Sequence, residues 1–195
     1  MTSTPALILE NVLLARQATD AALLNFQLMS KDKVLVLGSN GCGKTTLVES
    51  IAGHLSIVSG EVGRGARLGY VTQQPLLPLS LTVKQYLKQL ESVCSDELAN
   101  DAEACISLFN LSQHAHQRIS KLSRGWQQRV NLAQAWLGNP NLIILDEPQT
   151  ALDPDGMQLL RSAIQKSEAA VVVFAPPQTG CESLIDNHLN FSQLC

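Results

Sequence analysis

A glycine-rich segment from Gly38 to Thr46 carries the residues best suited to chemistry in this sequence. It fits the pattern G-x-x-x-x-G-K-[ST], in which glycine N–H groups turn inward and form a nest for an anion. A helix that follows adds the positive end of its dipole, which favours phosphate. The Lys44 ammonium would reach the β- and γ-phosphates of a nucleotide, and the Thr45 hydroxyl would ligate Mg²⁺. The candidate nucleotide-binding residues are therefore Gly38, Ser39, Asn40, Gly41, Cys42, Gly43, Lys44, Thr45 and Thr46.

A glycine turn that joins a strand to a helix and binds nothing is the alternative interpretation of this segment. At an average glycine usage of about 7%, the four fixed positions match by chance in roughly one chain of this length per hundred. The segment also follows an apolar run, Val34–Leu37, and precedes a helical pattern, Lys44–His54. Because a phosphate loop needs this strand-to-helix context, the sequence favours a phosphate site. Cys42 occupies a variable position, where we expect a packed small residue rather than a reactive thiol.

Two carboxylates, Asp146 and Glu147, end a second apolar run, Leu142–Leu145. An Asp at the carboxyl end of a strand in a parallel sheet lies beside the phosphate loop, where ligands gather. Asp146 could hold Mg²⁺ through water, since Mg²⁺ keeps several waters and takes few carboxylates. Glu147 could act as the general base on an attacking water. Taken alone, the two residues could equally be the polar end of a capped strand.

The composition describes a folded chain that is close to neutral. Of the 195 residues 45% are hydrophobic, which suits a packed core and excludes disorder. The net charge of −3 and the 4% of aromatic residues argue against nucleic acid as a partner. We find neither an apolar run of the roughly 18 to 20 residues that a membrane helix needs nor a signal peptide. The five cysteines form no C-x-x-C pair, so we expect no zinc or redox site and reduced cytosolic thiols.

Apolar runs alternate with helical spacings along the chain, and this predicts an α/β fold with a mostly parallel sheet covered on both faces. We expect a turn to begin at Ser59-Gly60, and a helical insert between Leu81 and Leu111 with Thr82 and either Ser95 or Asp96 as N-caps. The other expected strands are Leu7–Leu14, Ala21–Met29 and Ala170–Phe174, and the other expected helices are Trp126–Leu137 and Met157–Gln165.

With these residues in place, the chain resembles the ATP-binding subunit of an ABC transporter over nearly its whole length. Gly38–Thr46 resembles the Walker A motif, and Leu142–Glu147 resembles Walker B. Gln73 falls where the family places the glutamine of its Q-loop. Leu122–Trp126 occupies the place of the signature LSGGQ, and Ala151-Leu152-Asp153 resembles the D-loop.

The resemblance implies a P-loop NTPase fold with N-terminal antiparallel β-elements, a mostly parallel central sheet and a helical subdomain insert. One ABC-type ATPase domain would span residues 1–195. Its RecA-like core, with the N-terminal β-elements, would comprise residues 1–74 and 141–195. The helical subdomain with the signature would comprise residues 75–140.

The resemblance also assigns roles to single residues. Glu147, Lys44 and Gln73 are the expected catalytic residues, and Thr45, Gln73 and Asp146 the expected metal ligands. Ser123 and Gly125 are expected nucleotide contacts. They stand at the start of a predicted helix, where a hydroxyl and N–H groups beside a positive dipole end could bind a second anion or simply begin a helix.

One chain cannot easily bring the Walker A loop and the signature to the same phosphate. The resemblance therefore implies two ABC domains, identical or different, that pack head to tail with ATP between one Walker A motif and the other signature. Asp153 would then lie at the dimer interface.

Three positions depart from the family pattern. The family carries a switch histidine after the last buried strand, where this sequence reads Ala175-Pro176-Pro177, and His188 comes too late to replace it. Loss of one positioned polar group typically costs roughly 10² to 10³ in rate, so we expect the isolated chain to hydrolyse ATP slowly. The family also stacks adenine on an aromatic residue near the N-terminus, and here Arg16 would have to take its place.

The signature itself carries Arg124 in place of Gly and Trp126 in place of Gln. An aromatic residue at this place, with a basic residue before the glycine, resembles ABC-2-type exporters. Arg124 either supplies charge to the γ-phosphate held by the partner, as arginine fingers do, or is a solvated side chain. The segment Gln134–Leu137 before Walker B is similar to the haem-exporter ATPase of cytochrome c maturation.

The resemblance implies a cytoplasmic ATPase that uses ATP and Mg²⁺ and is held at the inner face of the membrane by separate permease chains of an ABC exporter. Closure of the dimer on ATP and its reopening after hydrolysis would reach the permease through the helical insert and the Gln73 loop. A first alternative is an ATP-binding interaction module with decayed hydrolysis, as the inactive half of an asymmetric pair. A second is a soluble ABC protein that acts on ribosomes or DNA, which the negative net charge disfavours.

Overall fold

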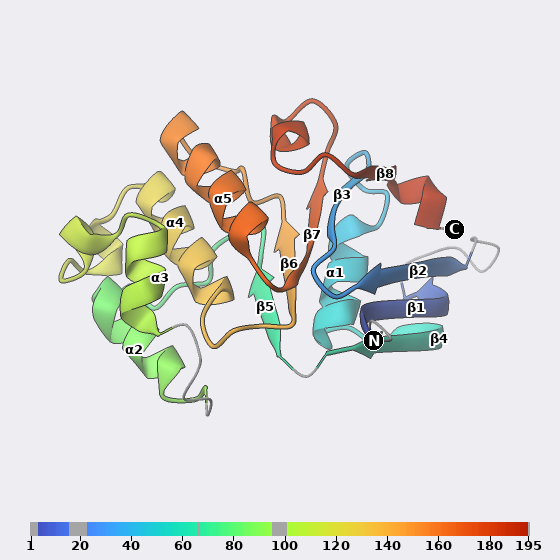
Figure 1. The fold of residues 1–195 in the computed structure, drawn as a ribbon, viewed down its shortest axis with the longest axis horizontal. Helices are drawn as coiled ribbons and strands as arrows, with labels where there is room; N and C mark the ends of the chain where they lie inside the picture. Colours follow the sequence, from blue (N-terminus) through green and yellow to red (C-terminus); the bar gives the residue numbers. More distant parts are fainter. Residues whose placement is uncertain (1–3, 16–22, 66, 95–100, 195) are drawn as a thin grey trace.

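The part of the chain that the computed structural model describes, residues 4–15, 23–65, 67–94 and 101–194, contains a central sheet of five parallel strands (Figure 1). The strand order is β5-β6-β7-β3-β8, and every neighbouring pair is parallel. The strands are β3 (Lys33–Leu37), β5 (Leu68–Val71), β6 (Leu142–Asp146), β7 (Ala170–Ala175) and β8 (His188–Asn190). The expected α/β fold with a parallel sheet is confirmed.

Both faces of this sheet are covered, which explains why its strands are continuous apolar runs. Alternate side chains enter two separate core clusters. Val34, Val36 and Ile144 pack on the side of α1 (Lys44–Ala52). Leu35, Ile143 and Leu145 pack instead in the cluster that includes residues of α4 (Arg124–Ala135) and α5 (Pro154–Lys166). Figure 1 shows these two helices on the other side of the central sheet from α1.

An antiparallel sheet in the order β2-β1-β4 lies beside α1. Its strands are β1 (Pro5–Leu14), β2 (Leu24–Met29) and β4 (Ile57–Arg64). The expected turn at Ser59-Gly60 is wrong, because β4 runs straight through these residues. Gly60 has φ +89° where the pairing with β1 shifts its register, and a Cβ there would lie 2.3 Å from the Asn11 carbonyl oxygen. The glycine therefore marks a β-bulge in a strand.

The expected helical insert contains α2 (Val83–Glu91) and α3 (Ala102–Leu108). Thr82 caps α2 as expected, in a capping box with Gln85. The expected caps Ser95 and Asp96 lie outside the described residues, and α3 is capped by Asp101, whose carboxylate accepts a hydrogen bond from the Ala104 N–H at 2.7 Å. None of the helices in the described ranges is long and apolar enough to cross a bilayer.

The helix α4 lies directly against β5 because Gly69 has no side chain. A Cβ at Gly69 would lie only 2.0 Å from the Ala135 carbonyl oxygen. The helix begins at Arg124, two residues earlier than expected, since Ser123 is its N-cap. For the same reason α5 begins at Pro154, after the N-cap Asp153, and not at Met157. The short strand β8 was not expected, because three residues carry no periodic pattern.

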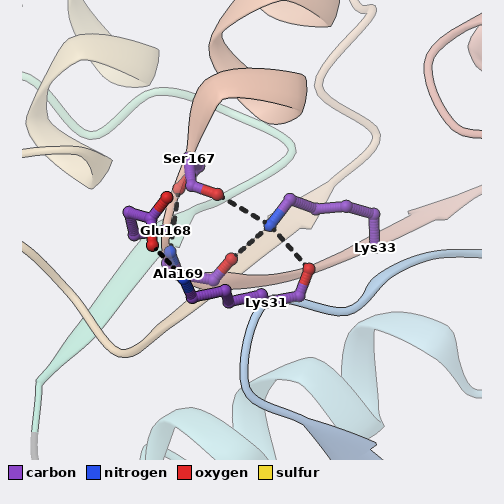
Figure 2. A network of polar contacts seen from close by, with 5 residues as sticks. All are labelled: Lys31, Lys33, Ser167, Glu168 and Ala169. Carbon is purple, nitrogen blue, oxygen red and sulfur yellow. Dashed lines mark hydrogen bonds and ion pairs between the residues drawn. The ribbon is translucent and has the colours of Figure 1, made fainter.

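Lys33 joins two neighbouring strands at the amino end of the sheet (Figure 2). Its ammonium donates hydrogen bonds to the carbonyl oxygens of Lys31 at 3.0 Å, Ser167 at 3.0 Å and Ala169 at 2.5 Å. These bonds tie the start of β3 to the connection between α5 and β7. Burial lowers the pKa of Lys33. The Lys31 ammonium forms an ion pair with Glu168 nearby, at the surface.

We predict that Lys33→Met destabilises the fold by about 1 to 3 kcal/mol. Methionine keeps the apolar stem but leaves the three carbonyl oxygens without their donor. Urea denaturation of the wild type and the variant measures the change in the free energy of unfolding. Lys31→Met is the matched control and should cost less than about 1 kcal/mol, because its ion pair is exposed. Equal losses in the two variants would contradict the role of the half-buried Lys33 ammonium.

Candidate functional site

The phosphate loop, residues 38–43, connects β3 to the first residue of α1. Gly41 and Gly43 have φ values of +82° and +109°, a region that favours glycine. At Gly38 a Cβ would lie 2.7 Å from the Cys42 sulfur, so a side chain there would disturb the loop. The start of α1 faces a cavity of about 370 Å³. This cavity is lined by Asn40, Gly41, Gly43, Lys44, Thr45, Thr46, Gln73 and Glu147.

Lys44 extends back over the loop that precedes it. Its side chain is buried, and its ammonium donates hydrogen bonds to the carbonyl oxygens of Gly38 at 2.7 Å and Ser39 at 3.0 Å. An ammonium has three N–H donors, so these two bonds leave capacity for a further acceptor. The loop thus presents a positive charge and a helix N-terminus to the same cavity, which suits a polyphosphate.

Asp146 ends β6 behind Thr45, and the two side chains are hydrogen-bonded. The Thr45 hydroxyl donates to Asp146 Oδ2 at 2.9 Å. Asp146 is 1% exposed, and its Oδ1 has no hydrogen-bond partner among the described residues. Burial raises the pKa of Asp146 to about 6. A buried carboxylate with a free oxygen beside a hydroxyl is an oxygen donor set that suits a hard cation such as Mg²⁺.

Glu147 and Gln73 meet at the mouth of the cavity. The Gln73 amide donates a hydrogen bond to Glu147 Oε2 at 3.0 Å. Glu147 has φ +48°, in the left-handed region that glycine favours, and its N–H donates to the Phe174 carbonyl oxygen on β7 at 2.8 Å. Backbone strain of this kind persists where the surroundings impose it, and it is typical of functional sites. The geometry suits a base that points toward a bound phosphate.

The remaining expected loop contacts, Ser39 and Cys42, face a second cavity on the other side of the loop. This cavity, of about 430 Å³, is also lined by Gly38, Pro177 and Phe191. Residues 176–178 therefore lie beside the phosphate loop, where the family carries its switch histidine. Here they form a turn in which the Gln178 N–H donates to Glu182 at 2.5 Å.

The sequence excluded His188 as a replacement for the switch histidine and offered Arg16 as the residue that stacks on adenine. His188 lies in β8, and its imidazole contacts the Ile185 carbonyl oxygen at 2.5 Å. Arg16 lies outside the described residues.

The signature residues Ser123 and Gly125 do not line the cavity that holds the Walker A and Walker B residues. Ser123 caps α4, and its hydroxyl accepts a hydrogen bond from the Trp126 N–H at 3.4 Å. A Cβ at Gly125 would lie 2.9 Å from the Ala151 carbonyl oxygen, so the helix start packs against the loop after Walker B. Arg124 is exposed. Within one chain, the candidate second anion site is therefore separate from the first.

Sequence reasoning missed the contacts that hold the signature helix to the D-loop. The Arg129 guanidinium lies 4.4 Å from the centre of the Trp126 ring and donates to Asp153 at 2.7 Å. This hydrogen bond holds the pKa of Asp153 below its usual range. Trp126 and Arg129 are three residues apart on one helix, a spacing that brings side chains together and could have indicated the pair.

Sequence reasoning also missed a row of amides on α4. Gln128 and Asn131 are 1% and 0% exposed, and both are hydrogen-bonded. Gln134 continues the row. A polar residue at every third position of a helix that is otherwise buried is the signal that could have found them.

Comparison with known proteins agrees with this geometry. The sequence profile of the family described as ABC transporter matches residues 22–150. The chain is 36% identical to the zinc import ATP-binding protein ZnuC of Paracoccus denitrificans, over 77% of this chain and 61% of that protein. It is 32% identical to the cytochrome c biogenesis ATP-binding export protein CcmA of Xylella fastidiosa, over 70% of this chain and 66% of that protein. It thus spans less than two thirds of the length of these two relatives.

A solved structure shares the fold. It is a dimeric ATP-binding cassette in a post-hydrolysis state, bound to ADP and Pi, and it matches with a TM-score of 0.78 at 22% identity. The match covers 94% of this chain and 93% of that one. The family profile covers most of the chain and includes the phosphate loop and both Walker B carboxylates. The resemblance expected from the motifs is therefore confirmed, and the chain belongs to the ABC transporter family.

Proposed function

We propose that this chain binds ATP with Mg²⁺ at the 370 Å³ cavity and hydrolyses it to drive a membrane permease. The observation that carries the proposal is the convergence of the Lys44 loop, Thr45 and the Gln73–Glu147 pair on one cavity, with Asp146 hydrogen-bonded to Thr45. Each of these three groups matches one requirement of phosphoryl transfer: charge for the phosphates, oxygen ligands for the cation, and a base for water.

The binding roles follow from the contacts. The loop amides and the Lys44 ammonium hold the β- and γ-phosphates, and Asn40 and Thr46 line the same cavity. Ser39 and Cys42 belong to the same loop, but they line the second cavity on its other side. Thr45, Asp146 and Gln73 hold Mg²⁺, which supplies positive charge to the phosphate oxygens when bound. The free Oδ1 of Asp146 is the atom that most needs a cation, because its burial disfavours the ionised form.

Glu147 is the general base in this proposal. Its carboxylate accepts a proton from the water that attacks the γ-phosphorus, and the bond to the leaving ADP oxygen breaks in line. Gln73 already donates to that carboxylate, so it fixes the direction in which the base points. Since Ala175-Pro176-Pro177 supplies no histidine to order the water, turnover by the chain alone is slow.

A second ABC domain completes the site. Ser123 and Gly125 lie away from the cavity of their own chain, and they bind the γ-phosphate held by the partner in a head-to-tail dimer. The exposed Arg124 is placed to add charge there. The division into a core (1–74 and 141–195) and a helical subdomain (75–140) stays part of this proposal. The dimeric cassette with ADP and Pi supports the arrangement by its fold.

The proposed direction of transport is export, by a complex whose permease holds the chain at the cytoplasmic face of the membrane. The support for export is the signature with Arg124 and Trp126, which is similar to that of ABC-2-type exporters. The relatives do not decide the direction, because their names include both a zinc import protein and a cytochrome c biogenesis export protein.

An ATP-binding interaction module with decayed hydrolysis is the second candidate, and the proline turn beside the phosphate loop favours it. The presence of Glu147, with its carboxylate hydrogen-bonded at the cavity, favours an active site.

We predict that Lys44→Ala weakens ATP binding by at least about 100-fold, because a charge-assisted contact to the phosphates is lost. Equilibrium dialysis with ATP and Mg²⁺ measures the affinity. Lys84→Ala is the matched control and should bind as the wild type does, since Lys84 pairs with Glu103 on the helical insert. Retained affinity in Lys44→Ala would refute the phosphate cradle.

We predict that the purified chain turns over ATP at less than about 1 s⁻¹, the low end of typical enzymes. Release of inorganic phosphate at saturating ATP measures the rate. Glu147→Gln should abolish the residual activity, because the amide cannot accept the proton. Turnover well above this limit would contradict the consequence drawn from the proline turn, and a wild-type rate equal to that of Glu147→Gln would favour the decayed module.

We predict that ATP converts Glu147→Gln from monomer to dimer, because binding without hydrolysis traps the head-to-tail pair. Analytical ultracentrifugation with and without ATP measures the change in mass. The double variant Glu147→Gln/Lys44→Ala is the control and should stay monomeric in both conditions. A dimer that forms equally without ATP would argue against nucleotide between the two domains.

A further inference from the structure

The helix α4 carries a row of amide side chains at three-residue spacing: Gln128, Asn131 and Gln134. Gln128 and Asn131 are 1% and 0% exposed, in a helix whose other buried positions are mostly apolar. Buried amides are costly unless each is hydrogen-bonded, so their partners indicate what they do.

Asn131 connects α4 to the Q-loop and to Gln128. Its Nδ2 donates to the Thr72 carbonyl oxygen at 3.2 Å and to Gln128 Oε1 at 3.2 Å. Gln128 in turn donates from Nε2 to the Pro148 carbonyl oxygen at 3.0 Å. The two amides therefore bridge two loops, and the bridge ends on the residue before Gln73 and on the residue after Glu147.

The bridge closes into a ring at the cavity. Gln73 donates to the Glu147 carboxylate at 3.0 Å, and the peptide bonds to Thr72 and to Pro148 complete the circuit. A ring fixes the relative position of its members better than a single hydrogen bond does, because no member can move without breaking another contact. Through this ring, α4 fixes the position of Gln73 relative to Glu147.

A branch of the same network reaches the helical insert. Gln134 donates to Asn131 Oδ1 at 2.6 Å, and the Tyr86 hydroxyl on α2 donates to Gln134 Oε1. Burial raises the pKa of Tyr86, which keeps this hydroxyl protonated as a donor. The branch satisfies the Asn131 carbonyl oxygen and lies outside the ring.

We propose that Asn131 is a positioning residue for ATP hydrolysis, which acts with Gln128 to align Gln73 with Glu147. This inference rests on the proposed function, in which Glu147 is the general base. The alternative is that the amides only satisfy buried carbonyl oxygens, so that their loss lowers stability and leaves the chemistry of the folded chain unchanged. The two roles differ in their effect on kcat and KM.

The test measures steady-state ATP hydrolysis and thermal unfolding of Asn131→Leu and Gln128→Met, which conserve side-chain volume and open the ring at different bonds. We expect kcat to fall about 10- to 100-fold in each, because the base loses its alignment. KM for ATP should change less than about twofold, because the phosphate loop is untouched. The double variant should lose no more than either single variant, since a ring opens only once. Tyr86→Phe, which leaves the ring closed, should keep the wild-type kcat.

Two results would overturn the role of the ring while leaving the proposed function intact. One is a wild-type kcat in both folded ring variants while Glu147→Gln abolishes turnover. The other is a fall in kcat with an equal rise in KM. If Glu147→Gln leaves the rate unchanged, the proposed function fails and this inference fails with it. If one ring variant does not fold, the other carries the test, because each opens the ring at a different bond. If neither folds, Asn131→Ala, which removes the amide without adding bulk, takes their place, and a wild-type kcat in that variant overturns the role of the ring.

Discussion

The Asp146 carboxylate is buried at the end of β6, and one of its oxygens has no partner among the described residues. Water would solvate such a group, and the interior does not, so burial raises its pKa to about 6. The free-energy cost of burying this carboxylate must be offset by a bound cation or by hydrogen-bond donors. The Thr45 hydroxyl offsets part of it, and a metal ion bound to a polyphosphate would offset the rest. The parallel sheet and the loops at its carboxyl edge keep this carboxylate in place.

The parallel sheet provides that placement. Because β3, β6 and β7 run in the same direction, their carboxyl ends meet at one edge, and the loops that follow them share one region. The phosphate loop follows β3, the two carboxylates end β6, and the Ala175-Pro176-Pro177 turn follows β7. The Glu147 N–H is bonded to the Phe174 carbonyl oxygen on β7, and the Gly38 N–H is bonded to the Ala175 carbonyl oxygen. Backbone contacts alone therefore bring three distant segments together.

The sequence predicted much of this fold and less of its detail. The buried strands, the phosphate loop and the two carboxylates could be found because each depends on a local pattern, an apolar run followed by residues of special chemistry. The bulge at Gly60 was mistaken for a turn, because glycine permits both and only the pairing with Asn11 decides between them. The three-residue strand β8 carries no pattern at all. The partners of Gln128, Asn131 and Arg129 were invisible, because they lie on loops that only the tertiary fold brings near α4.

The amino and carboxyl edges of the central sheet are joined by different kinds of contact. At the amino edge, the Lys33 ammonium ties the start of β3 to the carbonyl oxygens of Ser167 and Ala169 before β7, and it also binds the Lys31 carbonyl oxygen of its own turn (Figure 2). At the carboxyl edge, the main-chain N–H groups of Gly38 and Glu147 donate to carbonyl oxygens of β7. The amino edge therefore depends in part on the side chain of one residue, whereas the carboxyl edge uses main-chain N–H groups, which every residue except proline supplies.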